Sequence, residues 1–279
     1  MKDTKYTYIV SSDLDGTLLT DGDKISPENG AAIAEMRERG ICFVPNSGRT
    51  FSEMPVSVLN NPDIRYYIGA DGSAIWDKET DELFELAMSR AEAKPVLDIL
   101  FSYDTVDTVR YKGRSYADAE KYGVENYDAH RLSQSYTKFI GYYVDKVGDF
   151  QNFVRGLDSI EMICSYFLSD RELNECRERI EALGDYKVAA SEPTNIEIFH
   201  KRAGKGNGML ALADMLGVPR ENTVAVGDSI NDLDMLEKAG ISLAMGNGMD
   251  EVKAVAHRTI CRCDEFSAKY ILENVIGKE

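Results

Sequence analysis

Two aspartates, Asp13 and Asp15, stand two positions apart directly after an apolar segment at residues 6–12. Because side chains of a strand alternate with a period of two, both carboxylates can point to the same side. Two like charges so placed repel each other, which favours a bound cation or a proton held on one of them. One carboxylate could then be a nucleophile that takes a phosphoryl group, and the other a general acid and base. The following Gly16 and Thr17 predict a tight turn whose N–H groups suit phosphate oxygens. An acidic surface turn is the alternative interpretation.

A second acidic group follows another apolar segment, at residues 223–226. Asp228, Asn231 and Asp232 carry hard oxygen atoms of the kind that Mg²⁺ prefers, together with phosphate and water. Simple capping is the alternative, since Asp and Asn are favoured where helices begin. Capping requires one such residue, so three of them favour a metal or phosphate site.

Two weaker signals complete a possible site. Ser47 and Gly48 follow the apolar segment 41–45 and could offer a hydroxyl and an N–H group to a phosphate. Lys205 stands between two glycines and could add a positive charge at a helix start. Alone, a Ser-Gly pair is usually a turn and a lysine is usually solvated. Their weight depends on lying beside the two acidic groups.

The elements that must position these residues alternate between strand and helix at both ends of the chain. Apolar segments predict strands at residues 6–12, 41–45, 66–69, 223–226 and 241–245. Capping and apolar spacing predict helices from Pro27 to Gly40, from Lys205 to Leu216 and up to Leu236. This alternation indicates a parallel sheet with right-handed crossovers, which binds ligands at the carboxyl ends of its strands. Both acidic groups and Ser47 follow predicted strands.

The middle of the chain reads as a separate α+β module, residues 83–190, inserted into a core of residues 1–82 and 191–279. The expected helices lie at residues 91–103 and 171–183, and the β-leaning segments at 105–110, 137–144 and 160–167. The core and the insertion are therefore expected to be distinct domains.

Composition excludes several classes of protein. The 32 Lys and Arg against 48 Asp and Glu give a net charge of −16, which disfavours nucleic acid and anionic membranes as partners. Five cysteines and three scattered histidines assemble no four-ligand zinc set, even at Cys261 and Cys263. No apolar segment approaches the ~20 residues of a membrane-spanning helix. The odd cysteine count and the lack of a secretion signal pattern predict a reducing, cytoplasmic location.

Four short motifs carry a family resemblance. In order along the chain they are Asp13-Leu14-Asp15-Gly16-Thr17-Leu18, Ser47-Gly48-Arg49, Lys205-Gly206 and Gly227-Asp228-x-x-Asn231-Asp232. Together they resemble the ordered motifs of the haloacid dehalogenase superfamily, most closely those of its Cof-like sugar-phosphate phosphatases. The resemblance implies an α/β fold, in which a Rossmann-like doubly wound parallel sheet carries an inserted α/β cap of the large type.

The resemblance also implies roles. Asp13 would be the nucleophile and a Mg²⁺ ligand, Asp15 the general acid and base and a ligand through its backbone carbonyl, and Asp228 the third protein ligand. The phosphoryl group would be held by Ser47, Gly48, Lys205 and Asn231. Asp232 would support the metal shell or orient Lys205, and Thr17 would support the metal ligands without binding the metal itself.

The function implied is a Mg²⁺-dependent phosphatase of small phosphorylated metabolites, sugar phosphates above all, working through an aspartyl-phosphate as a monomer or homodimer. A phosphomutase of the same superfamily is one alternative. A non-catalytic phospho-aspartate signalling protein is another, although such receiver domains are roughly half this length and lack the Asp-Gly-Thr pair. One departure concerns Asp71, where many relatives have Asn.

Overall fold

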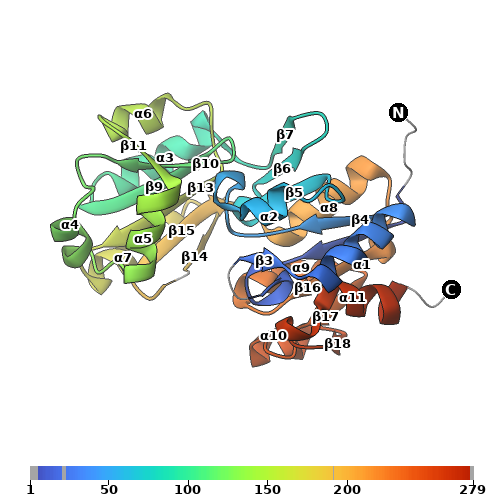
Figure 1. Ribbon diagram of the computed structural model, residues 1–279. Helices are drawn as coiled ribbons and strands as arrows, with labels where there is room; N and C mark the ends of the chain where they lie inside the picture. The colour runs from blue at the N-terminus through green and yellow to red at the C-terminus, as the bar shows by residue number, and fades with distance from the viewer. Residues whose placement is uncertain (1–5, 21–22, 191, 277–279) are drawn as a thin grey trace. The chain divides into compact units, whose positions relative to one another are not determined.

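The computed structural model describes residues 6–20, 23–190 and 192–276 (Figure 1). The chain divides into two compact units. The core unit comprises Met1–Phe84 with Gly204–Glu279, and the inserted unit comprises Glu85–Ala203. Within the described ranges, no helix is long and apolar enough to cross a membrane.

The core unit is built on a five-stranded parallel sheet, which confirms the predicted sheet type. Its strands, in spatial order, are β18 (Arg258–Thr259), β17 (Ile241–Ala244), β16 (Thr223–Gly227), β1 (Tyr8–Ser12) and β4 (Ile41–Pro45). Ser12 at the end of β1 is in register with Val226 on one side and Pro45 on the other. The residues that follow these strands therefore emerge at one edge of the sheet.

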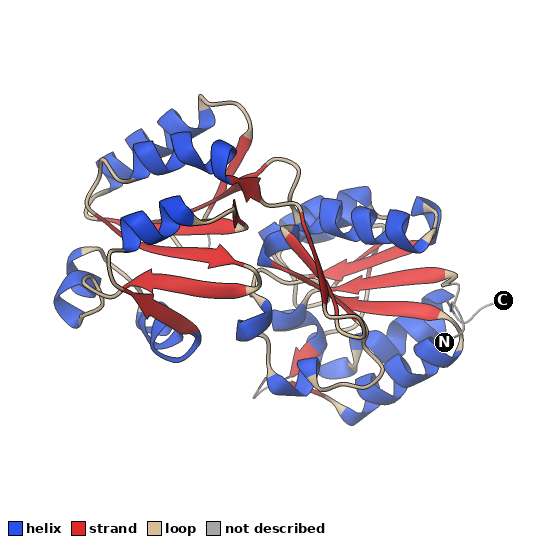
Figure 2. Cartoon of the chain, turned by 90° about the horizontal axis from the view of Figure 1, so that it is seen from above, coloured by secondary structure: helices blue, strands red, loops and turns tan. Residues whose placement is uncertain are grey.

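Helices cover both faces of this sheet (Figure 2), as expected for parallel strands buried on both sides. Val10, Phe43 and Val226 pack on one face against α1 (Pro27–Glu38) and α11 (Ser267–Ile271). Ile9, Val44 and Ala225 pack on the other face. The helices there are α8 (Lys205–Leu216), α9 (Leu233–Lys238) and α10 (Asp250–Val255). The alternating strand residues thus serve two separate cores, which is a doubly wound arrangement.

Smaller elements complete the core unit. They are the hairpin β2 (Leu19–Thr20) and β3 (Lys24–Ile25), the short helix α2 (Val56–Leu59), and the sheet of β5 (Tyr66–Gly69), β6 (Ala74–Asp77) and β7 (Glu82–Glu85). The predicted strand at 66–69 is β5. It lies beside the extension of β4, because the Ser47 N–H donates to the carbonyl of Ile68 at 3.0 Å.

The inserted unit contains a six-stranded sheet that is antiparallel except for one pair. Its strands, in spatial order, are β11 (Val144–Val147), β10 (Arg114–Asp118), β9 (Thr105–Tyr111), β13 (Met162–Phe167), β15 (Asn195–His200) and β14 (Tyr186–Ala189). One apolar core joins this sheet to α3 (Arg90–Leu100), α6 (Phe150–Gly156) and α7 (Asp170–Glu181). The remaining elements are α4 (Val124–Ala129), α5 (Gln134–Tyr143), and the pair β8 (Met88–Ser89) with β12 (Ser159–Ile160).

The two ends of the inserted unit are tied to each other within that unit. Arg202, next to its last residue, donates hydrogen bonds at 2.5 Å to the carbonyl of Ala87 and to Glu92 Oε2. Lys187 Nζ donates to the carbonyl of Ala203 at 3.3 Å. Entry and exit segments therefore lie together.

Two expectations differ from the structure. The segment 137–144, expected to be β-leaning, is wrong as a strand: it lies in α5, and β11 begins only at Val144. Ser133 caps this helix by accepting from the Tyr136 N–H at 3.1 Å. Tyr136 and Ile140, four residues apart, join the same apolar cluster, so helical spacing prevailed over β-propensity.

The expected domain boundary after residue 190 also differs. β15 pairs with both β13 and β14, so it belongs to the sheet of the inserted unit, which continues to Ala203. Residue 191, where the second core segment was expected to start, lies outside the described residues.

Candidate active site

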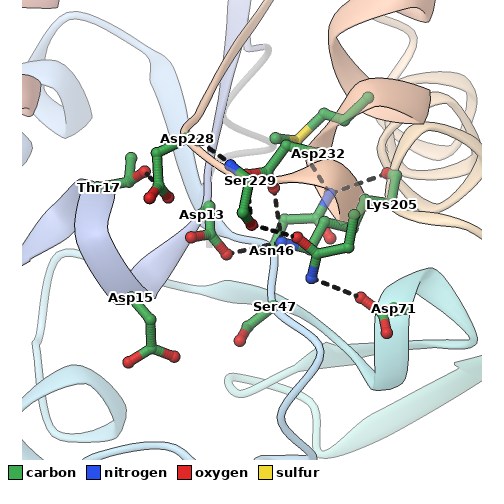
Figure 3. Close-up of polar contacts among 12 residues, drawn as sticks. Asp13, Asp15, Thr17, Asn46, Ser47, Asp71, Lys205, Asp228, Ser229 and Asp232 are labelled. Carbon is green, nitrogen blue, oxygen red and sulfur yellow. Dashed lines mark hydrogen bonds and ion pairs between the residues drawn. The ribbon is translucent and has the colours of Figure 1, made fainter. Parts of the chain in front are cut away.

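Asp13 lies at the centre of the cluster at the carboxyl edge of the core sheet (Figure 3). Its backbone N–H donates to the carbonyl of Val226 at 3.0 Å, which continues the pairing of β1 with β16. On the other side, the Asn46 N–H donates to the carbonyl of Ser12 at 2.8 Å. Asp13 is only 5% exposed. The sheet thus presents a carboxylate at its edge yet keeps it from bulk water.

The ammonium group of Lys205 lies between two carboxylates. Its Nζ donates to Asp13 Oδ1 and to Asp232 Oδ1, each at 2.6 Å, and its side chain is 0% exposed. Burial opposes the charge, but Asp13 and Asp232 outweigh it, so the pKa of Lys205 is raised. Lys205 is the first residue of α8 and remains a cation.

Asp232 organises the turn that follows β16. Its Oδ2 accepts hydrogen bonds from the N–H groups of Asp228 at 2.9 Å and Ser229 at 3.0 Å, while its Oδ1 accepts from Lys205. Both oxygens are therefore engaged. This arrangement positions Lys205 and Asp228 rather than offering a free ligand.

Oxygen atoms from Asp13, Asp228 and Asp232 lie within 4.8 Å of one another, which is a possible metal site. Because Asp232 already accepts hydrogen bonds at both oxygens, Asp13 and Asp228 are the better donors. Hard carboxylate oxygens suit Mg²⁺. Gly16 provides further support, because a Cβ atom there would lie 2.5 Å from Asp228 Oδ2 and the backbone has φ +76°. A glycine is required for the first motif to approach Asp228 so closely.

The protonation balance of Asp13 also fits a cation. Burial raises the pKa of Asp13 well above its ordinary range, Lys205 opposes this, and the charges of Asp232 and Asp228 add to the increase. Burial and Asp232 likewise raise the pKa of Asp228, although the Thr17 hydroxyl donates to its Oδ1 at 3.1 Å. A further positive charge would keep both carboxylates ionised.

The Ser47 loop and the Asn231 turn lie beside this cluster. Ser47 is buried, and its hydroxyl oxygen accepts from the Arg49 N–H at 3.2 Å. The Asn231 amide donates to Asp71 Oδ1 at 3.3 Å and accepts from the Ser229 hydroxyl at 2.6 Å. Since a carboxylate can only accept, Asp71 fixes which end of the Asn231 amide carries the NH₂ group.

Asp71 lies close to the Ser47 loop, because its backbone N–H donates to the carbonyl of Ser47 at 3.1 Å. A Cβ atom on Gly48 would lie 3.2 Å from both carboxylate oxygens of Asp71. A Cβ atom on Gly72 would lie 2.0 Å from the carbonyl oxygen of Gly204, just before Lys205. Gly72, at φ +83°, has to be glycine at this contact, whereas a Cβ atom on Gly48 would require only a small shift of the Asp71 carboxylate. Asp71 joins the group as a further carboxylate.

Asp15 is placed differently from Asp13. Its carboxylate is 56% exposed, points away from the Asp13 cluster (Figure 3), and forms an ion pair with Arg49. Lys205 thus joins Asp13 and Asp232, and Asp228 lies against them, while the Asp15 side chain stands apart.

Sequence reasoning missed two contributors, Asn46 and Arg49. Asn46 is fully buried and donates to the Ser11 hydroxyl at 3.0 Å and the Lys205 carbonyl at 2.9 Å. A polar residue directly after an apolar strand is the signal that could have identified Asn46. Arg49 was quoted within its motif without a role, and only the folded chain shows its partners.

Residues 10–267 match a family described as haloacid dehalogenase-like hydrolase. The phosphatase YwpJ of Bacillus subtilis (strain 168) is 28% identical over 284 residues, covering 96% of this chain and 99% of that protein. A second relative from this organism, the 5-amino-6-(5-phospho-D-ribitylamino)uracil phosphatase YcsE, is 26% identical over 249 residues, covering 89% of this chain and 87% of that protein.

A solved structure shows the same fold. A haloacid dehalogenase-like hydrolase from B. subtilis superimposes with a TM-score of 0.77 at 27% identity, covering 96% of this chain and 99% of that one. The likeness therefore extends over both units.

Proposed function

The chain belongs to the haloacid dehalogenase-like hydrolases, and we propose that it is a Mg²⁺-dependent phosphatase of small phosphorylated metabolites, sugar phosphates above all. The relatives described above are named phosphatases. One observation carries the proposal: the buried carboxylate of Asp13 lies 2.6 Å from the ammonium of Lys205, beside Asp228 at a sheet edge. A structural ion pair needs no third carboxylate there.

In the first step, a carboxylate oxygen of Asp13 attacks phosphorus, and the bond to the ester oxygen breaks. Asp15 gives its proton to the departing alcohol. An aspartyl-phosphate forms on Asp13. In the second step, water attacks this phosphorus and passes a proton to Asp15, which releases inorganic phosphate and restores Asp13.

The phosphoryl oxygens would be held by Lys205, the Ser47 hydroxyl, the Gly48 N–H and the second hydrogen of the Asn231 amide. Magnesium, when bound, would neutralise charge on the phosphoryl group. Asp13, Asp228 and the backbone carbonyl of Asp15 would hold it. Asp232 keeps Lys205 aimed at Asp13, and the Thr17 hydroxyl steadies Asp228.

The inserted unit is assigned substrate recognition in this proposal. It has apolar cores of its own, and the motifs of the core unit account for the phosphoryl chemistry without it. Replacing Glu85–Ala203 by the corresponding region of a relative should change the ranking of substrates but not the nucleophile. A chimera with an unchanged ranking would contradict this assignment.

The test of the proposed function is a panel of phosphate monoesters, assayed for inorganic phosphate with Mg²⁺. Free phosphate is expected from one or two preferred sugar phosphates, whereas transfer back to the sugar would indicate a phosphomutase. No release from any ester would contradict the proposal.

The intermediate is tested with Asp15→Asn. This variant keeps the nucleophile but lacks the acid and base, each contributing typically 10² to 10⁴-fold. An aryl phosphate, whose leaving group needs little protonation, should phosphorylate the variant and leave an adduct on Asp13 that mass spectrometry detects. An adduct on another residue would contradict the assignment of Asp13.

A further inference from the structure

The guanidinium group of Arg49 makes a two-point contact with Asp15. Its Nε donates to Asp15 Oδ2 at 2.9 Å, and its Nη2 donates to Asp15 Oδ1 at 2.6 Å. Nη2 also donates to Asp23 Oδ1 at 3.2 Å, and Nη1 donates to the carbonyl of Glu53 at 3.3 Å. A two-point contact between arginine and a carboxylate fixes the position and the plane of the carboxylate.

The exposed side chain of Asp15 is not restricted by packing, so a hydrogen-bonded partner is needed to hold it in one rotamer. Its side chain is more than half exposed, while that of Arg49 is mostly buried. An exposed aspartate samples several rotamers, yet a general acid must lie within hydrogen-bond reach of the leaving oxygen. Restricting its side chain therefore favours proton transfer.

Asp23 is the second carboxylate that accepts a hydrogen bond from Arg49. Its carbonyl accepts from the Ser57 hydroxyl at 2.8 Å, which fastens the β2–β3 hairpin to the segment bearing α2. Its carboxylate shares Nη2 of Arg49 with Asp15. Asp23 therefore holds the Nη2 end of Arg49 in place independently of Asp15.

We propose that Arg49 is a positioning residue for the general acid Asp15, and that Asp23 anchors the Arg49 side chain. This inference rests on the function proposed above. The Ser47–Arg49 segment then serves both halves of the reaction, because Ser47 holds the phosphoryl group and Arg49 holds the acid.

Direct binding of the phosphoryl group is the competing role for Arg49, since arginine often contacts phosphate. An arginine side chain has five N–H donors. The hydrogen bonds to Asp15, Asp23 and Glu53 use four of them. The geometry therefore favours positioning of Asp15.

The test compares an alkyl and an aryl phosphate in the full chain carrying Arg49→Met. For the alkyl ester, whose departure requires the acid, the rate of alcohol release in a single turnover should fall about 10- to 100-fold. For the aryl ester, the rate of alcohol release in a single turnover should fall less than about threefold, because its leaving group needs little protonation, and inhibition by inorganic phosphate should not change. Arg49→Lys, which keeps the charge but not the two-point contact, should recover part of the alkyl activity. Asp23→Asn should also lower the rate with the alkyl ester more than the rate with the aryl ester, but the loss with the alkyl ester should stay below about 10-fold.

Equal losses with both esters, or weaker inhibition by inorganic phosphate, would overturn the positioning role and indicate phosphate binding. Arg49→Lys supplies the same comparison if Arg49→Met does not fold. Failure of the unaltered enzyme to hydrolyse either ester would contradict the proposed function instead, so the two failures are distinguishable.

Discussion

Each unit buries at least one aspartate, and Asp13 of the core unit and Asp107 of the inserted unit have different surroundings. Asp13 in the core unit and Asp107 in the inserted unit are 5% and 6% exposed, and burial raises the pKa of each. Asp13 lies at a strand end and accepts from Lys205. Asp107 lies within β9, where the Thr105 hydroxyl donates to its Oδ2 at 2.9 Å. Burial of an aspartate therefore does not by itself indicate a functional site. A buried aspartate that lies beside a cation and further carboxylates does.

The largest expected difference is in catalysis. Asp13→Asn should lower turnover of a sugar phosphate by at least about 10⁴-fold, because loss of a nucleophile removes the covalent route. The same isosteric change in the inserted unit, Asp107→Asn, should alter turnover less than about threefold. Steady-state assays of both purified variants measure this, and comparable losses in the two would remove the distinction between the units.

The second largest effect is expected from metal removal, which should act on the carboxylate cluster of the core unit. Chelation should reduce activity to background, and Mg²⁺ should restore it, whereas the larger Ca²⁺ should support activity poorly. Mg²⁺ should also raise the melting temperature by mass action, and Asp228→Asn should reduce that increase. Full activity after exhaustive chelation would contradict the metal site, and an undiminished increase in Asp228→Asn would place the ion elsewhere.

Ion pairs of the two units should differ in stability. Lys205→Met leaves Asp13 and Asp232 buried without their cation, so the free energy of unfolding should fall by about 3–5 kcal/mol. Arg114→Met removes an exposed pair with Asp145 in the inserted unit and should cost at most about 1 kcal/mol. Urea denaturation provides both values. An equal cost for the two would mean that Lys205 offsets little of the burial of its partners.

The smallest effect is expected at Asp107. Burial disfavours its ionised form, so folding stability should decline as pH rises from the ordinary aspartate pKa, near 4, through the raised folded pKa, and should then level off. Asp107→Asn removes this decline and should stabilise the protein by about 1 kcal/mol at neutral pH. Thermal melting of both proteins across pH 4–8 tests this, with Asp145→Asn as the exposed control. A destabilised variant would show that the carboxylate is well compensated.

The secondary structure of the core unit could be predicted from the sequence more completely than that of the inserted unit, for a physical reason. Continuous apolar segments followed by Asp13, Ser47 and Gly227-Asp228 predicted the parallel strands and the edge where their ends meet, and family, fold class and sheet type are confirmed. Neither α5 nor the extent of the inserted unit was visible, because strand pairing and helix packing between distant segments decide them.

Contacts of single side chains were the least predictable. The pairing of Arg49 with Asp15 depends on where two loops meet, and no local pattern encodes it. The assignments of nucleophile, acid and metal ligands stay predictions, tested by the variants above.

The tie between Arg202 and Ala87 bears on how the chain folds. The contact of Asp13 with Lys205 joins residues 192 positions apart, a separation that slows the search for native contacts. Loop-closure entropy grows only slowly, by ~0.6 kcal/mol per doubling of loop length. If the inserted unit folds first, the contact between Arg202 and Ala87 holds its two ends together. The folded unit then connects the two core segments as a short loop would. Refolding of the core should then follow the inserted unit in time, and weakening Arg202 should slow assembly of the Asp13–Lys205 contact more than it lowers final stability.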